Sequence, residues 1–329
     1  QQDLHSRLPQ NQPLNRPLSL QKKFGKEVVA GNNTQGVEFV SSGSLSLDLA
    51  LGGGYAMGRI IELRGYESSG KTTLALTACK NIQEQTGKAV LYIDRENAID
   101  MDYVEALGVN ISPEMFILCQ PGVAEECFEI MREAVKSKAI GAIVMDSVAA
   151  MFPKCYLEAD VGDAKMGVLA RLMATWLPGL IGDIKLNQQL VIFINQYRDK
   201  IGVVYGSPKT TPGGKALGFY SSQVLDIAKS GTVGDRGEET ANHIKVKVEK
   251  NKVAPPFRKA EFDIRFGEGI DKASELLLVG VERGIIEKAG SFFKYKGKTL
   301  AQGQEKAREI ISSDIDLAEE IEEQIMKTI

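Results

Sequence analysis

The chain has 329 residues, of which 43% are hydrophobic and 25% are charged, as in ordinary globular proteins. This length allows one large domain with smaller accessory parts and a sizeable buried core. The formal net charge of −3 excludes a strongly basic protein that attracts nucleic acid through its overall charge. Any site for a polyanion must therefore be local.

The cysteine and histidine pattern argues against a zinc site and against a disulfide framework, because no two cysteines have a C-x-x-C spacing and only two histidines are present. We therefore expect reduced, buried thiols at Cys79, Cys119, Cys127 and Cys155. No apolar run reaches the roughly 18 residues of a membrane-spanning helix, and the polar start does not resemble a signal peptide. We expect no membrane partner and a cytoplasmic location.

The first 18 residues contain three prolines among Gln and Asn, a composition that cannot bury enough apolar surface to order itself. We predict a flexible arm here. A short basic segment at 21–26 leads to the small polar stretch at 31–36, which we interpret as a hinge before the core.

Short apolar runs then alternate with longer helical patterns. Nearly unbroken apolar runs are typical of strands buried on both faces, so these predict a parallel sheet in an α/β fold. The runs are residues 60–63, 89–93, 143–145 and 190–194. Beyond residue 220 the pattern changes to alternation, at 243–249 and 262–266, which predicts antiparallel strands that extend the sheet. Helical patterns near 272–283 and 303–327 around residues 292–297 predict a small separate α/β module.

Residues 65–72 read GYESSGKT and match the phosphate-binding pattern G-x-x-x-x-G-K-S/T, between a predicted strand and a helical pattern over 73–85. The glycines let backbone N–H groups surround phosphates, Lys71 adds a positive charge, and the Thr72 hydroxyl can bind Mg²⁺. A chance match has odds of about one in a hundred, so an ordinary Gly-Ser turn is the weaker interpretation. We predict that ATP is held by Gly65, Glu67, Ser68, Ser69, Gly70, Lys71, Thr72 and Thr73.

Asp146 follows the apolar strand pattern 142–145, at the edge of the sheet where a Mg²⁺ partner is needed. An Asp at a strand end is also a common turn former, so the Mg²⁺ interpretation of Asp146 depends on the presence of the phosphate loop. Candidates for activating water are Asp94, Glu96 and Asp100, and spacing alone cannot choose among them, since at least two could cap the next helix. Gln196, after the strand at 190–194, could contact a terminal phosphate or close a turn.

The segment 196–218 is unusual because structureless loops longer than about 15 residues are uncommon inside a compact domain unless they are functional. Its glycines, its scattered Arg and Lys and the isolated Tyr205 suit a segment that orders on a sugar-phosphate backbone. A mobile lid over the nucleotide explains the same composition equally well.

Four segments together resemble the bacterial RecA-type recombinase family, and the likeness runs from about residue 21 almost to the end. They are SSGSLSLD at 41–48, GYESSGKTT at 65–73, INQ at 194–196 and KNK at 250–252. The resemblance implies an N-terminal arm and polymerisation segment at 1–35, an ATPase core at 36–269 with DNA-binding loops at about 158–166 and 196–215, and a C-terminal module at 270–329. It also implies helical filaments on single-stranded DNA that pair with duplex DNA, with DNA-stimulated hydrolysis of ATP.

The resemblance also implies roles for single residues. Glu96 corresponds to the water-activating glutamate, and Gln196 to the amide that couples the γ-phosphate to DNA. Asp100 and Tyr103 match positions that hold adenine. Lys250 and Lys252 match cations that reach the ATP of a neighbouring subunit, where they stabilise transition-state charge only in an assembled filament. For DNA, the resemblance implies Met166 and Ile201 as wedges between base triplets, and positions near the phosphates for Arg171, Arg198, Gly213 and Gly214. The composition of the loop adds Lys200, Tyr205 and Lys215 as candidate DNA contacts.

Several positions depart from the family pattern and suggest a divergent member, such as one encoded by a virus. They affect the expected DNA affinity and cross-subunit activation, and are Arg95, Asn97, Pro178, Asp199, Gly218 and Val224. Two other functions compete with recombination. A ring-shaped motor would share the phosphate loop and Asp146 but would unwind DNA, and a filament could act mainly as a scaffold for self-cleavage of LexA-like repressors. Single-strand-binding or loader proteins are further expected partners.

Overall fold

The computed structural model describes residues 36–157, 167–199, 209–235 and 238–328. The chain divides into a unit of residues 1–37 and a unit of residues 38–329, and all helices and strands given below belong to the second. The predicted arm, most of the predicted hinge and the first predicted DNA loop, up to residue 166, lie outside the described residues.

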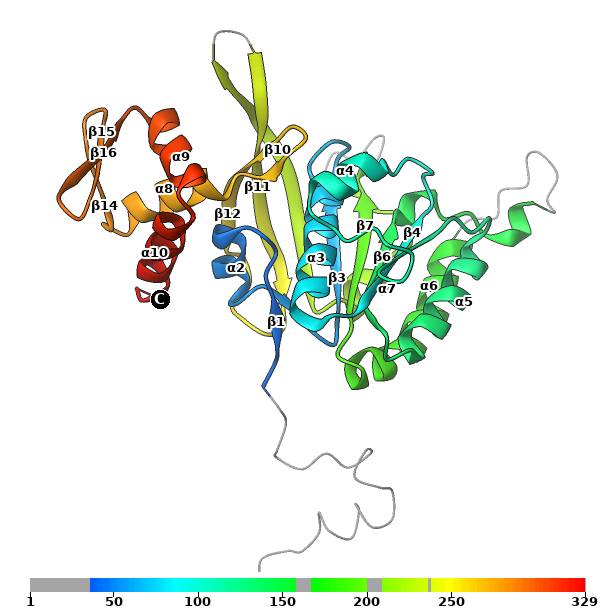
Figure 1. Cartoon of the computed structure of the whole chain (residues 1–329). Helices are drawn as coiled ribbons and strands as arrows, with labels where there is room; N and C mark the ends of the chain where they lie inside the picture. The colour runs from blue at the N-terminus through cyan, green and yellow to red at the C-terminus, as the bar shows by residue number, and fades with distance from the viewer. Residues whose placement is uncertain (1–35, 158–166, 200–208, 236–237, 329) are drawn as a thin grey trace, which may run out of the picture. The chain divides into compact units, whose positions relative to one another are not determined.

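Among the described residues, nine strands form one mixed sheet in the order β13-β12-β11-β10-β3-β7-β6-β4-β5 (Figure 1). The six strands from β10 to β5 run parallel, and β11, β12 and β13 continue the sheet in antiparallel fashion. This arrangement confirms the predicted α/β fold with antiparallel strands added at one side. The strands are β3 (Arg59–Gly65), β4 (Ala89–Asp94), β5 (Phe116–Cys119), β6 (Ile140–Asp146), β7 (Leu190–Gln196), β10 (Gln223–Asp235), β11 (Glu238–Asn251), β12 (Lys259–Arg265) and β13 (Gly269–Ile270).

Two hydrophobic cores cover the two faces of this sheet. Alternate residues of β7 divide between them, with Leu190, Ile192 and Ile194 in one core and Val191 and Phe193 in the other. This is the two-residue period of a strand buried on both faces. The first core packs against α2 (Leu45–Leu51), α3 (Lys71–Thr86) and α4 (Met101–Ala106), and the second against α5 (Ala124–Lys136), α6 (Val168–Leu186) and α7 (Ala216–Tyr220).

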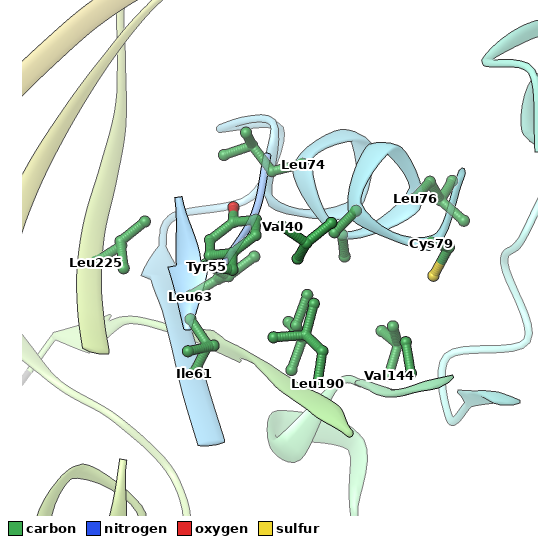
Figure 2. Packing of buried hydrophobic residues seen from close by; sticks show 14 of the residues in the cluster. Val40, Tyr55, Ile61, Leu63, Leu74, Leu76, Cys79, Val144, Leu190 and Leu225 are labelled. Atoms are coloured by element: carbon green, nitrogen blue, oxygen red, sulfur yellow. The ribbon is translucent and has the colours of Figure 1, made fainter. Parts of the chain in front are cut away.

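Figure 2 shows the first core from close by, with Leu190 and Val144 of the sheet facing Leu76 and Cys79 of α3. This packing fixes α3 against the parallel strands. The loop that joins β3 to α3 is therefore held between two buried elements, which places it at the carboxyl edge of the sheet.

Short elements complete this part of the chain. A two-stranded sheet of β1 (Phe39–Val40) and β2 (Tyr55–Ala56) precedes β3, and a second pair, β8 (Arg198–Asp199) and β9 (Lys209–Thr210), follows β7. Two 3₁₀ turns, η1 (Val148–Ala150) and η2 (Lys154–Tyr156), follow β6.

The C-terminal residues have a hydrophobic core of their own. Strands β14 (Ile286–Ala289), β15 (Phe292–Tyr295) and β16 (Lys298–Gln302) form an antiparallel sheet that packs with α8 (Lys272–Glu282), α9 (Gln304–Ser313) and α10 (Ile315–Met326). The continuous helical pattern predicted over 303–327 is broken. Asp314 ends α9 and caps α10 by accepting a hydrogen bond from the backbone N–H of Leu317, so its side chain competes with helix continuation.

None of the four cysteines, all of which lie in the described part of the chain, forms a disulfide, but only half of the burial prediction is right. Cys79 and Cys127 are buried, whereas Cys119 and Cys155 are partly exposed. The periodic patterns locate helices and strands, but they do not fix how much of each side chain is covered. Among the residues that the structure describes, no helix is both long and apolar enough to cross a bilayer.

Candidate functional site

The predicted phosphate loop lies between the end of β3 and the start of α3. Gly70 precedes the helix with φ +89, and a Cβ there would lie 2.6 Å from the Ile264 side chain, so only glycine fits. Having no side chain, Gly70 leaves the first N–H groups of α3 free of a side-chain cap. Such N–H groups together with the helix dipole form an anion site.

Lys71 is buried at the first position of α3, and its Nζ donates hydrogen bonds to the Tyr66 carbonyl at 2.5 Å and to Ser69 Oγ at 3.3 Å. Burial lowers the pKa of Lys71, and the charges of Asp146, Glu96 and Glu67 oppose this effect. The lysine therefore lies inside the phosphate loop, surrounded by carboxylates that favour its charged form.

The end of β6 brings a carboxylate to the same place. Asp146 Oδ2 accepts hydrogen bonds from Thr72 Oγ1 at 3.0 Å and from the Tyr92 hydroxyl at 2.5 Å. Burial raises the pKa of Asp146, while these two hydrogen bonds lower it. A hydroxyl and a carboxylate 3.0 Å apart are hard oxygen donors of the kind that Mg²⁺ prefers. The residues present therefore fit the predicted metal.

The structure separates the three candidate bases. Asp94 accepts hydrogen bonds from the backbone N–H groups of Glu96 and Ile99, and Asp100 caps α4. Both carboxylates are thus engaged in local structure, although only Asp100 caps the next helix. Glu96 is exposed and accepts hydrogen bonds from Ser147 Oγ at 2.5 Å and from Gln196 Nε2 at 2.7 Å.

A pocket of about 320 Å³ adjoins the phosphate loop. Among the described residues, Tyr103 lines this pocket and Asp100 does not, and the Tyr103 hydroxyl is hydrogen-bonded to Thr73 Oγ1 at 2.9 Å. The opposite wall comes from β11, β12 and the turn after β12, a contribution that sequence reasoning missed. It is made by Asn242, Ile244, Ile264, Arg265, Phe266 and Gly267.

The two lysines predicted to act across subunits lie away from the phosphate loop of their own chain. In the sheet, Val224 of β10 lies between Lys250 of β11 and Glu62 in the middle of β3. The Lys252 N–H donates to the Ser222 carbonyl, and Ser222 lies beside the start of β3. At about 3.3 Å per strand residue, Glu62 lies about 10 Å and Ile60, which bonds Ser222, about 16 Å from Gly65 at the end of the strand. Lys250 Nζ instead donates to the Gly218 and Phe219 carbonyls, both at 2.8 Å.

The ends of the second predicted DNA loop are more ordered than expected for a continuous loop, because β8 and β9 pair in antiparallel register. The Tyr197 N–H donates to the Gly65 carbonyl at 3.2 Å, and the Tyr66 hydroxyl donates to Asp199 at 2.7 Å. This loop is therefore attached directly to the phosphate loop. Lys200, Ile201 and Tyr205 lie outside the described residues, as does Met166 of the first predicted loop.

The remaining predicted DNA residues divide between two places. Arg198 is exposed and donates to the Ala149 carbonyl at 3.4 Å, while Gly213 and Gly214 pack with positive φ against η1 and the start of α6. A Cβ on Gly214 would lie 2.8 Å from that of Ala170. Arg171 is exposed in α6, and the exposed Lys215 precedes α7. The structure thus brings Arg198 and the two glycines to η1 and α6.

Most of the departures from the family pattern have a structural account. Arg95 donates to the Pro121 and Gly122 carbonyls, and Asp199 accepts the Tyr66 hydroxyl. A Cβ on Gly218 would lie 2.5 Å from the Arg64 side chain. Val224 is buried in β10 and Pro178 lies inside α6. Asn97 has φ +52, a conformation that Asn tolerates better than most residues.

Comparison with known proteins gives consistent matches over nearly the whole chain. The family profile of the RecA N-terminal domain matches residues 14–271, and that of the RecA C-terminal domain matches residues 274–329. The chain is 49% identical to Protein RecA of Porphyromonas gingivalis over 315 residues, which are 94% of this chain and 92% of that protein. It is 47% identical to Protein RecA of Caulobacter vibrioides, over 94% and 87% of the two chains.

A solved structure is also similar. The crystal structure of the RadB recombinase matches with a TM-score of 0.54 and 25% identity, over 70% of this chain and 98% of that one. The shared fold and the family profiles together make the phosphate loop that of a P-loop NTPase.

Proposed function

Since the chain belongs to the RecA family of recombinases, we propose that it is a DNA-dependent ATPase that forms helical filaments on single-stranded DNA. The filament pairs this strand with homologous duplex DNA and exchanges strands. Family membership supports ATP binding, DNA binding and self-assembly as a group of properties. The finer assignments rest on the geometry of the site.

The contact that carries the proposal joins Gln196 to Glu96. Gln196 is the last residue of β7 and leads directly into the second loop, and its Nε2 lies 2.7 Å from Glu96 Oε1. A change in the second loop therefore reaches the candidate base through one hydrogen bond. This arrangement suits an ATPase whose turnover depends on what the second loop binds.

For hydrolysis, we assign Lys71 to the terminal phosphates and Glu96 to the attacking water, which it orients and deprotonates. Thr72 and Asp146 would hold Mg²⁺, which neutralises phosphate charge when bound. The rest of the nucleotide would occupy the pocket beside Tyr103, with the phosphates on the backbone of the loop. Asp100 remains an adenine contact only by the resemblance, since its side chain caps α4.

For DNA, we assign the second loop and the neighbouring start of α6. Arg171, Arg198 and Lys215 are exposed cations that suit phosphate contacts. Gly213 and Gly214 pack closely against η1 and α6, which would let their backbone come close to the DNA. The wedge roles of Met166 and Ile201 stay predictions from the resemblance, and the contacts of Lys200 and Tyr205 stay predictions from the composition of the loop.

For assembly, we assign Lys250 and Lys252 to the ATP of the next subunit. Along the strands, Lys250 lies about 10 Å and Lys252 about 16 Å from the phosphate loop of their own chain, so they suit action in trans better than action in cis. Hydrolysis would then require a filament. Scaffolding of LexA-like repressor cleavage and the loader and single-strand-binding partners also stay predictions from the resemblance. The cytoplasmic location stays a prediction from composition.

The test is the ATP hydrolysis rate with and without single-stranded DNA, together with negative-stain images of the same samples. We expect strong stimulation by DNA, helical filaments and loss of hydrolysis in Lys71→Ala. An ATP hydrolysis rate that is the same with and without DNA would contradict the proposal. Closed rings that unwind duplex DNA would favour a motor instead.

A further inference from the structure

A cluster of four side chains connects the phosphate loop to the paired ends of the second loop, and we call it the junction. It consists of Tyr66, Tyr197, Asp199 and Lys209. The Tyr66 hydroxyl donates to Asp199 at 2.7 Å, and the two tyrosine rings lie 5.7 Å apart. Lys209 Nζ lies 5.1 Å from the centre of the Tyr66 ring and 4.9 Å from that of Tyr197, within the range of cation–π attraction.

Tyr66 connects the phosphate loop to β8 through two hydrogen bonds. Its backbone carbonyl accepts the hydrogen bond from Lys71 Nζ, and its hydroxyl binds Asp199 in β8. A displacement of β8 therefore moves the residue that holds the phosphate-loop lysine. This connection is separate from the Gln196–Glu96 contact, because it acts on the phosphate-binding lysine and not on the candidate base.

The charges of the junction explain why a carboxylate can lie in a segment that faces a polyanion. Asp199 would repel DNA phosphates, but it accepts the Tyr66 hydroxyl and pairs across the two strands with Lys209. Opposite charges at paired positions stabilise such a ladder. DNA phosphates near β8 and β9 would compete for Lys209 and would oppose the charge of Asp199, so bound DNA changes the balance within the junction.

We propose that the junction is a positioning element through which DNA bound at the second loop adjusts Lys71 in the phosphate loop. The proposal rests on the proposed DNA-stimulated ATPase. It assigns to Tyr66 and Asp199 a coupling role that requires the tyrosine hydroxyl and the carboxylate together. Neither side chain needs to touch the nucleotide.

The test compares Tyr66→Phe, Asp199→Ala and the double variant, each with its hydrolysis rate at saturating single-stranded DNA divided by its rate without DNA. Loss of one exposed hydrogen bond, with the net value of an ordinary one, should lower this ratio by about threefold to tenfold in each single variant. Because both changes remove the same bond, the double variant should be no lower than the lower single variant. Unfolding midpoints are measured alongside, to establish that each variant is folded.

Thr232→Val is the matched control. It also removes an exposed hydroxyl bonded to a carboxylate, that of Glu239 at 3.0 Å, but on the distant part of the β10–β11 pair. We expect an unchanged ratio in this control. Unchanged ratios in both single variants, or losses that multiply in the double variant, would overturn the junction. A wild-type protein without DNA stimulation would contradict the proposed function itself, which distinguishes the two failures.

Discussion

Gln196 Nε2 donates a 2.7 Å hydrogen bond to Glu96 Oε1, so the end of β7 contacts the carboxylate that follows β4. These two residues are 100 positions apart in the chain. Parallel strands bring their carboxyl ends to one edge of the sheet, and the order β7-β6-β4 places Asp146 of β6 between them. The site is therefore a property of the strand order as much as of the motifs.

Glu96→Gln is expected to lower ATP hydrolysis by about 10²-fold to 10⁴-fold, the usual contribution of a positioned general base. The amide keeps the size of the side chain but cannot take a proton. Nucleotide affinity, measured with a fluorescent ATP analogue, should change little. Asp102→Asn, an exposed carboxylate in the first turn of α4, is the matched control. Full hydrolysis in Glu96→Gln would remove this residue from the mechanism.

The sequence predicted the parts of the site that lie within one motif. The phosphate loop, the buried strands and Asp146 followed from spacing and periodicity, because each depends on local order along the chain. The choice among Asp94, Glu96 and Asp100 did not, since all three follow one strand. The resemblance implied Glu96, and the hydrogen bonds that engage the two aspartates locally support that proposal.

The sequence did not predict the contacts between segments that are far apart in the chain. Tyr66 and Asp199 are 133 positions apart, and the sequence marks Asp199 only as a departure from the family pattern. The second wall of the nucleotide pocket depends on the register of β11 against β12, which pairs Asn242 with Ile264. Alternation predicts that such strands exist, but not which residues lie opposite each other.

Thr72→Val is expected to raise the Mg²⁺ concentration for half-maximal hydrolysis by about tenfold, because a hard cation loses one oxygen ligand. The hydrogen bond to Asp146 is lost in the same variant. Thr72→Ser keeps the hydroxyl and should behave like the wild type in a Mg²⁺ titration. If both variants needed the same Mg²⁺ concentration as the wild type, the assignment of Thr72 to the metal would be wrong.

A mixing experiment separates action across subunits from action within one chain. Lys250→Ala and Glu96→Gln should each hydrolyse ATP poorly, since each lacks one part of the proposed site. Mixed filaments contain interfaces where the intact Glu96 of one subunit meets the intact Lys250 of another. We expect hydrolysis to recover on mixing, to about a quarter of the wild-type rate for random equimolar assembly, because an assembled site uses one residue from each neighbour.

Lys250 also donates to the carbonyls at the end of α7, so its loss could act through local structure instead. In that case the mixture would show only the sum of the two weak activities. Lys245→Ala, an exposed lysine on the same strand, serves as the control for loss of one positive charge.

Glu275 of α8 is expected to make stability depend on pH. Its buried carboxylate accepts hydrogen bonds from Ser44 Oγ at 2.6 Å and from the backbone N–H groups of Leu45 and Ser46, both at 3.2 Å, and so joins α8 to the start of α2. Burial raises the pKa of Glu275 from an ordinary value of 4.5 to about 7, although these hydrogen bonds oppose the shift.

Because the pKa of Glu275 is higher in the folded protein, the folded state binds the proton more tightly. The stability that this proton contributes is complete below pH 4.5 and is lost as the pH rises through about 7. Glu275→Gln cannot titrate, so its unfolding free energy should rise relative to that of the wild type over this window. The slope for one proton is at most about 1.4 kcal/mol per pH unit. Urea unfolding at pH 5, 6, 7 and 8 measures the difference, with the exposed Glu282→Gln of the same helix as control. A difference that stays constant from pH 5 to 8 would show that Glu275 has no such role.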